Sequence, residues 1–160
     1  MMSLRFIWIF APILLLSCQH AVDPNVSPEL ILEDYSHITE PEARWQAYAL
    51  KSYTIEQRRI CFCIFAHGFV KLVVQNNKIV AGTDLTNGQP VPADILQYYQ
   101  TIDELFDWIE QRQAENPARL EVEYDARFGY PRKIAFDYST AIADDELWIE
   151  MQSLHKFSEQ

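Results

Sequence analysis

A strongly amphipathic helix pattern lies in the middle of the chain and restricts what the sequence on either side of it can fold into. Thr101-Ile102-Asp103-Glu104 is a capping box, which predicts where the helix begins, and Asn116-Pro117 predicts where it ends. Apolar residues recur at i, i+3, i+4 and i+7, at Ile102, Leu105, Phe106 and Ile109. Such a helix needs a second layer packed against its apolar stripe.

Strand patterns on both sides of this helix can supply that layer. The first group is rich in β-branched and aromatic residues, and Asn76-Asn77 within it suits a tight hairpin turn. In the second group, apolar residues alternate with polar ones, which is typical of a sheet with one wet face. We expect strands over residues 53–64, 70–75, 78–83, 120–124, 134–138 and 147–152.

A shorter helix is expected ahead of the first strand. Thr39-Glu40-Pro41-Glu42 has the form of a second capping box, with Pro41 in the first turn. The expected order is therefore α-β-β-β-α-β-β-β. Hairpins with few helices indicate the α+β class, with an antiparallel sheet of about five to six strands and two helices packed on one face.

The N-terminal residues predict export and lipid attachment. Residues 1–18 read MMSLRFIWIFAPILLLSC, with Arg5 ahead of an apolar run that is too short to span a bilayer. Ser17-Cys18 ends this run and resembles the bacterial lipobox, in which the Cys sulfur is diacylated, for example with palmitate. The alternative is an ordinary signal peptide or short anchor that contains a Cys.

The chain is accordingly divided into three parts. We expect a signal peptide over residues 1–17, lipidated Cys18 with a tether over residues 18–40, and a single α+β domain over residues 41–158. With 160 residues and 49% hydrophobic residues, the chain is long enough for one core. Gln19 follows the Cys, which implies the periplasmic face of the outer membrane if the host is Gram-negative.

The charge of the chain argues against nucleic acid as a partner. The net charge is −10, and removal of residues 1–17 takes away one Arg and no acid, which gives −11. A surface of this sign repels phosphate backbones. It also disfavours binding to anionic lipid by charge alone, so membrane attachment must come from lipid at the N-terminus.

Two cysteines remain if Cys18 carries lipid. Cys61 and Cys63 would lie about 6.6 Å apart in a flat strand, at the far edge of disulfide geometry, so a bond needs a bend there. In an oxidising compartment we favour this disulfide. Two free or buried thiols, or a metal or redox site with His67, are the alternatives.

No catalytic motif is recognised in the sequence. Neither G-x-S-x-G nor H-E-x-x-H occurs. Four acids near the last hairpin could gather around a hard cation, although a solvated loop is the reading we favour: Asp137, Asp144, Asp145 and Glu146. Aromatic residues are plentiful, and most are expected in the core, while an exposed subset would form a binding patch: Trp45, Tyr98, Tyr99, Trp108, Tyr130 and Trp148.

Several motifs together resemble one family of small bacterial lipoproteins, DUF6174, over about residues 41–155. They are Trp45 and Tyr53, Cys61-Phe62-Cys63, a Val-rich hairpin, the run Tyr99 to Phe106, Tyr124-Asp125 with Gly129-Tyr130-Pro131, Ile134 with Asp137, and Asp144-Asp145-Glu146. The resemblance implies an exported, often lipidated domain of unknown function. It supports the predicted location and adds no mechanism.

The sequence thus predicts a membrane-anchored lipoprotein of the cell envelope. We expect a non-enzymatic binding or scaffolding module, with no cofactor apart from the covalent lipid on Cys18. Its partners would be the membrane, through that lipid, and an envelope protein. The alternative is a small metal-binding or thiol-redox protein that uses Cys61, Cys63 and His67.

Overall fold

The computed structural model of the chain describes residues 31–62, 68–142 and 144–157. The predicted signal peptide, Cys18, Cys63 and His67 lie outside these ranges. None of the helices among the described residues is long and apolar enough to cross a membrane.

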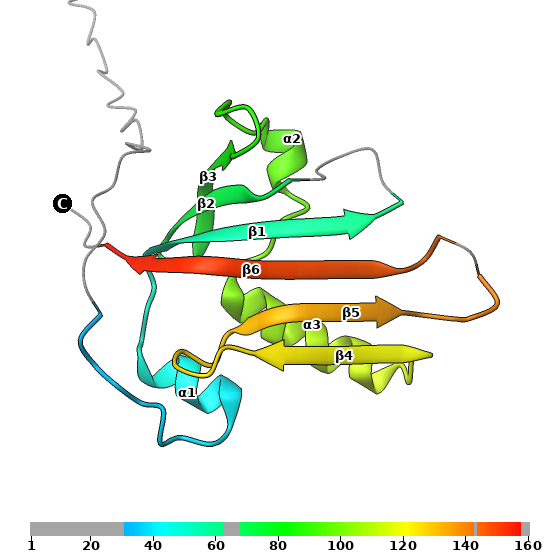
Figure 1. The fold of residues 1–160 in the computed structure, drawn as a ribbon, viewed down its shortest axis with the longest axis horizontal. Coiled ribbons are helices and arrows are strands. Elements are labelled where there is room, and N and C mark those ends of the chain that lie inside the picture. The colour runs from blue at the N-terminus through cyan, green and yellow to red at the C-terminus, as the bar shows by residue number, and fades with distance from the viewer. Residues whose placement is uncertain (1–30, 63–67, 143, 158–160) are drawn as a thin grey trace, which may run out of the picture.

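Nine helices and strands make up the described part of the chain (Figure 1). In order they are α1 (Pro41–Ala47), β1 (Tyr53–Cys61), β2 (Val70–Gln75), β3 (Lys78–Asp84), α2 (Ala93–Leu96), α3 (Ile102–Ala114), β4 (Arg119–Tyr124), β5 (Pro131–Asp137) and β6 (Leu147–Lys156). All six expected strands are present. The expected order is wrong at one point, because the single turn of helix α2 follows Pro92, where we expected only loop.

The six strands form one antiparallel sheet in the order β3-β2-β1-β6-β5-β4. The first and last strands of the domain lie side by side at its centre, where Arg59 pairs with Ile149 and Cys61 pairs with Leu147. Each half of the sequence therefore contributes a three-stranded meander. The predicted antiparallel α+β architecture is confirmed.

The core lies between the sheet and the helices. The apolar stripe of α3 is buried there, with Ile102 and Leu105 fully enclosed. The indole Nε1 of Trp45 in α1 donates to Asp103 Oδ1 at 2.6 Å, and the Tyr53 hydroxyl accepts from Ile102 N at 2.9 Å. These two bonds fix the start of α3 against α1 and β1.

The opposite face of the sheet is charged and solvated. Cross-strand ion pairs lie on it, between Arg58 and Glu150 and between Lys133 and Glu123. Gln152 Nε2 also donates to Glu56 Oε2 at 2.8 Å. These pairs explain the alternation of apolar and polar residues in the strands, because each strand presents one side to the core and the other to water.

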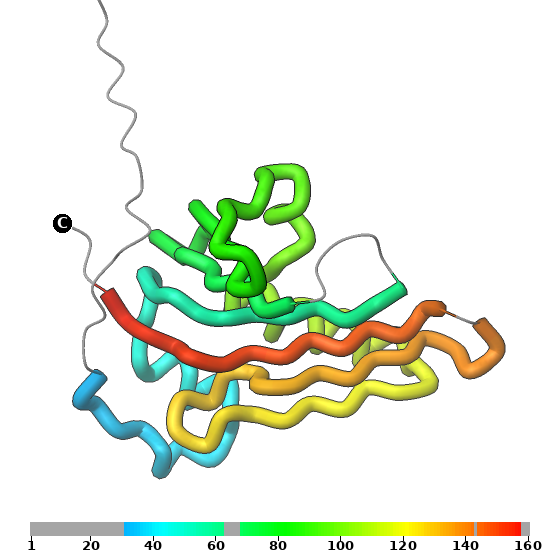
Figure 2. Tube along the Cα trace, turned by 45° about the horizontal axis from the view of Figure 1, so that its top comes forward, coloured from blue at the N-terminus to red at the C-terminus, as the bar shows by residue number. Residues whose placement is uncertain are grey.

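Different parts of the chain lie at the two ends of the sheet. β1, β3 and β5 run in the same direction and finish together, and we call this the loop end. The other end holds the start of the described chain, where the Ile31 carbonyl accepts from Arg127 Nη2 at 2.5 Å and Ile31 is buried. In Figures 1 and 2 this start, in blue, lies beside the finish of β6.

Candidate functional site

The cysteine predictions are covered only in part by the described residues. Cys61 ends β1 at the loop end and is disulfide-bonded. Its partner, like Cys18 and His67, lies outside the described ranges. Lipidation of Cys18, the pairing of Cys61 with Cys63 and the role of His67 therefore stay predictions.

The four acids near the last hairpin do not form a metal site. Within residues 31–62, 68–142 and 144–157, no three His, Cys, Asp or Glu side chains lie close enough together to hold a metal ion. Asp145 instead stabilises its own loop, because its Oδ2 accepts a hydrogen bond from Ser139 N at 3.1 Å. The hard-cation reading of Asp137, Asp144, Asp145 and Glu146 gains no support from this arrangement.

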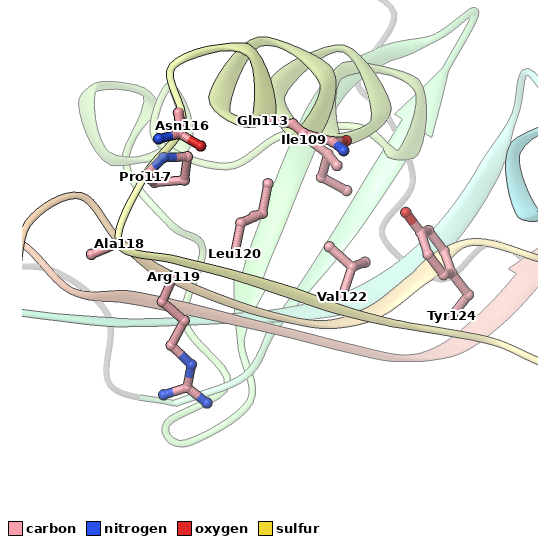
Figure 3. A pocket seen from close by; sticks show the side chains of 9 residues that line it. All are labelled: Ile109, Gln113, Asn116, Pro117, Ala118, Arg119, Leu120, Val122 and Tyr124. Carbon is pink, nitrogen blue, oxygen red and sulfur yellow. The ribbon is translucent and has the colours of Figure 1, made fainter.

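A groove runs between α3 and the edge strand β4, and its volume is about 370 Å³. Leu120, Val122 and Tyr124 point from β4 towards α3, while Arg119 points away (Figure 3). Ile109, Gln113 and Asn116 line the helix side. Every buried polar side-chain atom among these lining residues has a hydrogen-bond partner. Nothing in the groove therefore marks it as a site for a specific ligand.

A second hollow lies at the loop end between β2, β3, α2 and Tyr99, and we call it the α2 pocket. Its volume is about 300 Å³, at the lower end of the range for small-molecule sites. Apolar and polar residues line it in similar numbers: Gly68, Val70, Asp84, Asn87, Gln89, Pro90, Val91, Pro92, Ile95 and Tyr99.

The rim of the α2 pocket is a loop that folds back along β3. Asp84 accepts from Thr86 N at 2.8 Å and from Asn87 Nδ2 at 3.1 Å, which forms a tight turn after the strand. Val91 N then donates to Gly82 O at 2.9 Å. A Cβ at Gly82 would lie 2.5 Å from Leu96 Cδ2, so the Leu96 side chain of α2 packs into the space that the glycine leaves open.

The segment that carries Tyr99 is held by Gln57, which is fully buried on the core side of β1. Its Nε2 donates to Gln100 O at 3.0 Å and its Oε1 accepts from Gln100 N at 3.3 Å. The segment between α2 and α3 is thereby held on the sheet. Tyr99 directly precedes Gln100, so its position beside the pocket is fixed by the same contact.

The Tyr99 side chain is only 3% exposed, and its hydroxyl has no hydrogen-bond partner among the described residues. Burial raises the pKa of Tyr99 to about 12. The hydroxyl is therefore neutral at physiological pH and able both to donate and to accept a hydrogen bond. An unsatisfied buried hydroxyl is costly, and in a native protein it calls for a partner.

Arg59 lies beside Tyr99. It is two residues after Gln57 on the same side of β1, and it pairs across the strands with the core residue Ile149. Its Nη1 donates to Gln100 Oε1 at 3.2 Å, whereas its Nε is buried without a partner in the described part of the chain. Desolvation lowers the pKa of Arg59. Its electrostatic interaction with the nearby Tyr99 acts in the opposite direction but is weaker.

Sequence reasoning did not single out Gln57, Arg59, Asp84 or Tyr99. The signal was present in β1, where the core side reads Tyr53, Ile55, Gln57, Arg59 and so turns from apolar to polar. Polar residues on the buried side of a strand require partners inside the protein or a ligand. Tyr99 belongs to the aromatic residues that are mostly expected in the core, and it is buried there.

Comparisons with known proteins assign the chain to a family but give no activity for it. The family model described as "Family of unknown function (DUF6174)" matches residues 37–156. No curated protein and no solved structure matches the chain.

Proposed function

Because the chain belongs to DUF6174, a family of unknown function, we propose a function from its own residues. It is a lipid-anchored domain of the bacterial cell envelope that binds a small molecule in the α2 pocket and does not transform it. The lipid on Cys18 is the only attached group that this proposal requires.

One observation carries the binding role. Tyr99 is almost completely buried and lines a pocket of about 300 Å³, and its hydroxyl has no partner among the described residues. Concave pockets in which a few polar groups fix the orientation of a ligand are the usual small-molecule sites of proteins. A ligand with a hydrogen-bonding group next to Tyr99 would satisfy the hydroxyl.

Binding without catalysis follows from the chemistry of the lining. The raised pKa of Tyr99 keeps it protonated near neutral pH, where it is a poor base and a poor nucleophile. Asp84, the acid in the lining, already accepts two hydrogen bonds from its own loop. These side chains are suited to holding a ligand rather than to moving a proton.

The position of the pocket suits a tethered protein. The described chain begins at Ile31, at the opposite end of the sheet from the α2 pocket. If residues 19–28 form a flexible tether, these ten residues would reach roughly 17 Å. A lipid at Cys18 would thus hold one end of the domain near the membrane and direct the pocket towards the periplasm.

The binding role can be tested by filling the pocket. A Val91→Trp variant places a large ring in the α2 pocket, while Val80→Trp places the same ring on the 39% exposed Val80 of β3. We expect native mass spectrometry of the mature, detergent-solubilised protein to show a small bound molecule in wild type and Val80→Trp but not in Val91→Trp. An adduct that persists in Val91→Trp would place binding elsewhere.

The anchor can be tested by intact mass. Mature protein purified from membranes should carry a diacyl mass on its first residue, Cys18, and Cys18→Ser should release the domain from the membrane fraction. Alkylation before reduction should leave Cys61 unlabelled. An N-terminus without lipid would remove the envelope anchor from the proposal.

A metal-binding or thiol-redox role for Cys61, Cys63 and His67 is the second proposal. Cys61 is disulfide-bonded, and a metal needs the free thiolate. This observation favours a redox role over a metal role. Mass lost to a chelator, or two alkylatable thiols in the purified protein, would support the metal reading instead.

A further inference from the structure

The two edges of the sheet differ in whether the chain itself covers them. At the β3 edge, the loop after the strand folds back, and Val91 N donates to Gly82 O while Asp84 N donates to Gln89 O, both at 2.9 Å. At the other edge, β4 has β5 as its only neighbour in the described sheet. Figure 1 shows β4 as the outermost strand on its side. An uncovered edge can pair with a strand from another chain.

The hydrogen bonds between β4 and β5 show which backbone groups of β4 face outwards. Ala118 N donates to Tyr138 O at 3.1 Å, in line with the register of the two strands. Bonded and non-bonded residues alternate along an antiparallel pair, so every second residue from Ala118 onwards bonds to β5. The residues between them direct their N–H and C=O groups to the open edge: Arg119, Glu121 and Glu123.

On the core side, the open edge borders the groove between α3 and β4. Leu120, Val122 and Tyr124 point towards α3 there, and each is only partly buried (Figure 3). The groove has a volume of about 370 Å³. A strand added to β4 would place every second side chain over this groove, because successive side chains of a strand point to opposite faces. These side chains should be apolar.

On the solvent side, β4 presents one cation followed by two anions. Glu121 is 67% exposed, and its Oε2 accepts from Arg119 at 2.7 Å. Glu123 contacts Arg132 and Lys133 of β5. Both carboxylates keep further acceptor sites. Opposite charges directly across two strands are favourable, and like charges are unfavourable. An antiparallel strand that complements this edge therefore carries two basic residues and then an acidic one at alternate positions.

We propose that the edge of β4 binds an extended segment of a partner protein as an additional antiparallel strand. Apolar residues of the segment lie over the groove. Between them, two basic residues and then an acidic one lie opposite Glu123, Glu121 and Arg119, in that order. Backbone hydrogen bonds join the strands, and the side chains set the register. This inference does not depend on the α2 pocket, which lies at the β3 edge of the sheet.

Synthetic peptides test the order of charges. The matching peptide is Val-Lys-Val-Lys-Val-Glu, blocked at both ends, and its control, Val-Glu-Val-Glu-Val-Lys, has the charges exchanged. In NMR titrations of the mature, detergent-solubilised protein, we expect the matching peptide to bind at least about ten times more tightly than the control. The amide signals that shift most should be those of Arg119, Glu121 and Glu123, whose N–H groups face the open edge.

N-methylated peptides test the backbone hydrogen bonds separately from the side chains. The lysine residues lie directly opposite Glu123 and Glu121, so their N–H groups bond to β4, whereas the valine N–H groups point away from it. We expect methylation of both lysine nitrogens to weaken binding at least about tenfold, and methylation of two valine nitrogens to change it by less than about threefold. Equal losses would overturn strand addition.

Substitutions in the protein test the same edge. Glu121→Pro removes an N–H group that faces outwards and leaves the bonds to β5 in place, so it should weaken binding of the matching peptide at least about tenfold. Glu121→Lys should remove most of the preference for the matching peptide. Glu33→Lys, the same charge change at an exposed position outside the sheet, is the matched control and should leave the preference unchanged. Thermal unfolding of each variant separates loss of binding from loss of fold.

Other occupants of the edge give different results. Equal binding of the matching and charge-exchanged peptides would overturn the proposed chemistry of the partner. Binding that persists in folded Glu121→Pro would overturn the assignment to β4. Wild-type dimers that Glu121→Pro dissociates would assign the edge to a second copy of the chain and so overturn it too. If neither peptide binds, this inference is wrong, while the comparison of Val91→Trp with Val80→Trp still tests the α2 pocket.

Discussion

The side-chain amide of Gln57 forms a hydrogen-bonded pair with the backbone of Gln100, 43 residues away. Nε2 donates to the carbonyl at 3.0 Å and Oε1 accepts from the amide N–H at 3.3 Å. The glutamine therefore takes the place that a neighbouring strand would take, and it satisfies the backbone of a segment that belongs to no helix or strand. This contact links the central strand to Tyr99.

Replacement of Gln57 by leucine should destabilise the domain strongly. Leucine has a similar size but leaves the N–H and the carbonyl of Gln100 without partners in the interior. Each such group costs about 1–3 kcal/mol, so we expect the free energy of unfolding to fall by about 2–4 kcal/mol. Denaturant titration measures it.

Gln152→Leu is the control for that change. Gln152 is exposed, and its Nε2 donates to Glu56 at the surface. We expect a change within about 0.5 kcal/mol. If both variants lost the same stability, the Gln57–Gln100 pair would have no special role, and its effect on Tyr99 would have to be reconsidered.

Gly129 should not tolerate a side chain. Its φ is +82°, and a Cβ would lie 2.2 Å from the Pro41 carbonyl at the start of α1. We expect Gly129→Ala to lower the free energy of unfolding by about 3 kcal/mol or more. Denaturant titration measures this loss.

Gly88→Ala is the matched control for Gly129→Ala, because Gly88 has φ +72° but nothing within 4 Å of the added Cβ. It should cost only about 1–2 kcal/mol of backbone strain; equal losses would mean that contact with α1 is unimportant.

Reduction of the disulfide at Cys61 distinguishes its possible partners. In a chain-entropy estimate, a bond to Cys63 closes a very short loop and stabilises the fold by about 1.5 kcal/mol, whereas a bond to Cys18 would give about 4 kcal/mol. We expect the smaller loss when reduced and oxidised protein are compared in denaturant. The larger loss would contradict both the pairing with Cys63 and the lipidation of Cys18.

The strands and the long helix could be predicted because their signals are local. The capping box at Thr101 and Glu104 is present in the structure, with both reciprocal hydrogen bonds. The box expected at Thr39 is wrong, because Glu40 is the N-cap and has no side-chain cap bond. Nearby, the Arg44 guanidinium donates to the carbonyls of Ile38 and Ala126 and so ties this turn to the β4–β5 loop. A contact between such distant residues leaves no local pattern.

The α2 pocket escaped prediction for the same reason. It depends on Asp84 of β3 and Tyr99 of the segment after α2 lining the same space, and only the tertiary fold brings these two residues together. A one-turn helix such as α2 is too short to show a helical period. Alternation could have shown that β1 turns polar on its core side, but not which residues it faces.

Alkaline pH should destabilise the domain partly through Tyr99. Its pKa is raised to about 12 in the folded state, from 10 in an unfolded chain. Below pH 10 the phenol is neutral in both states, and the fold is unaffected. Between about pH 10 and 12 the unfolded chain ionises while the folded one resists, so stability falls as the pH rises. The buried Tyr53 and Tyr130, whose pKa values are also raised, add to this loss.

In Tyr99→Phe the free energy of unfolding should therefore fall less steeply between pH 10 and 12. Ionisation of Tyr53 and Tyr130 should still cause part of the loss. Denaturant titrations at pH 8, 10 and 11.5 measure the slope, and phenolate absorbance reports which tyrosines ionise before unfolding. An unchanged slope in Tyr99→Phe would show that the hydroxyl is already open to water. The pocket would then lack the enclosed, neutral donor on which ligand binding depends.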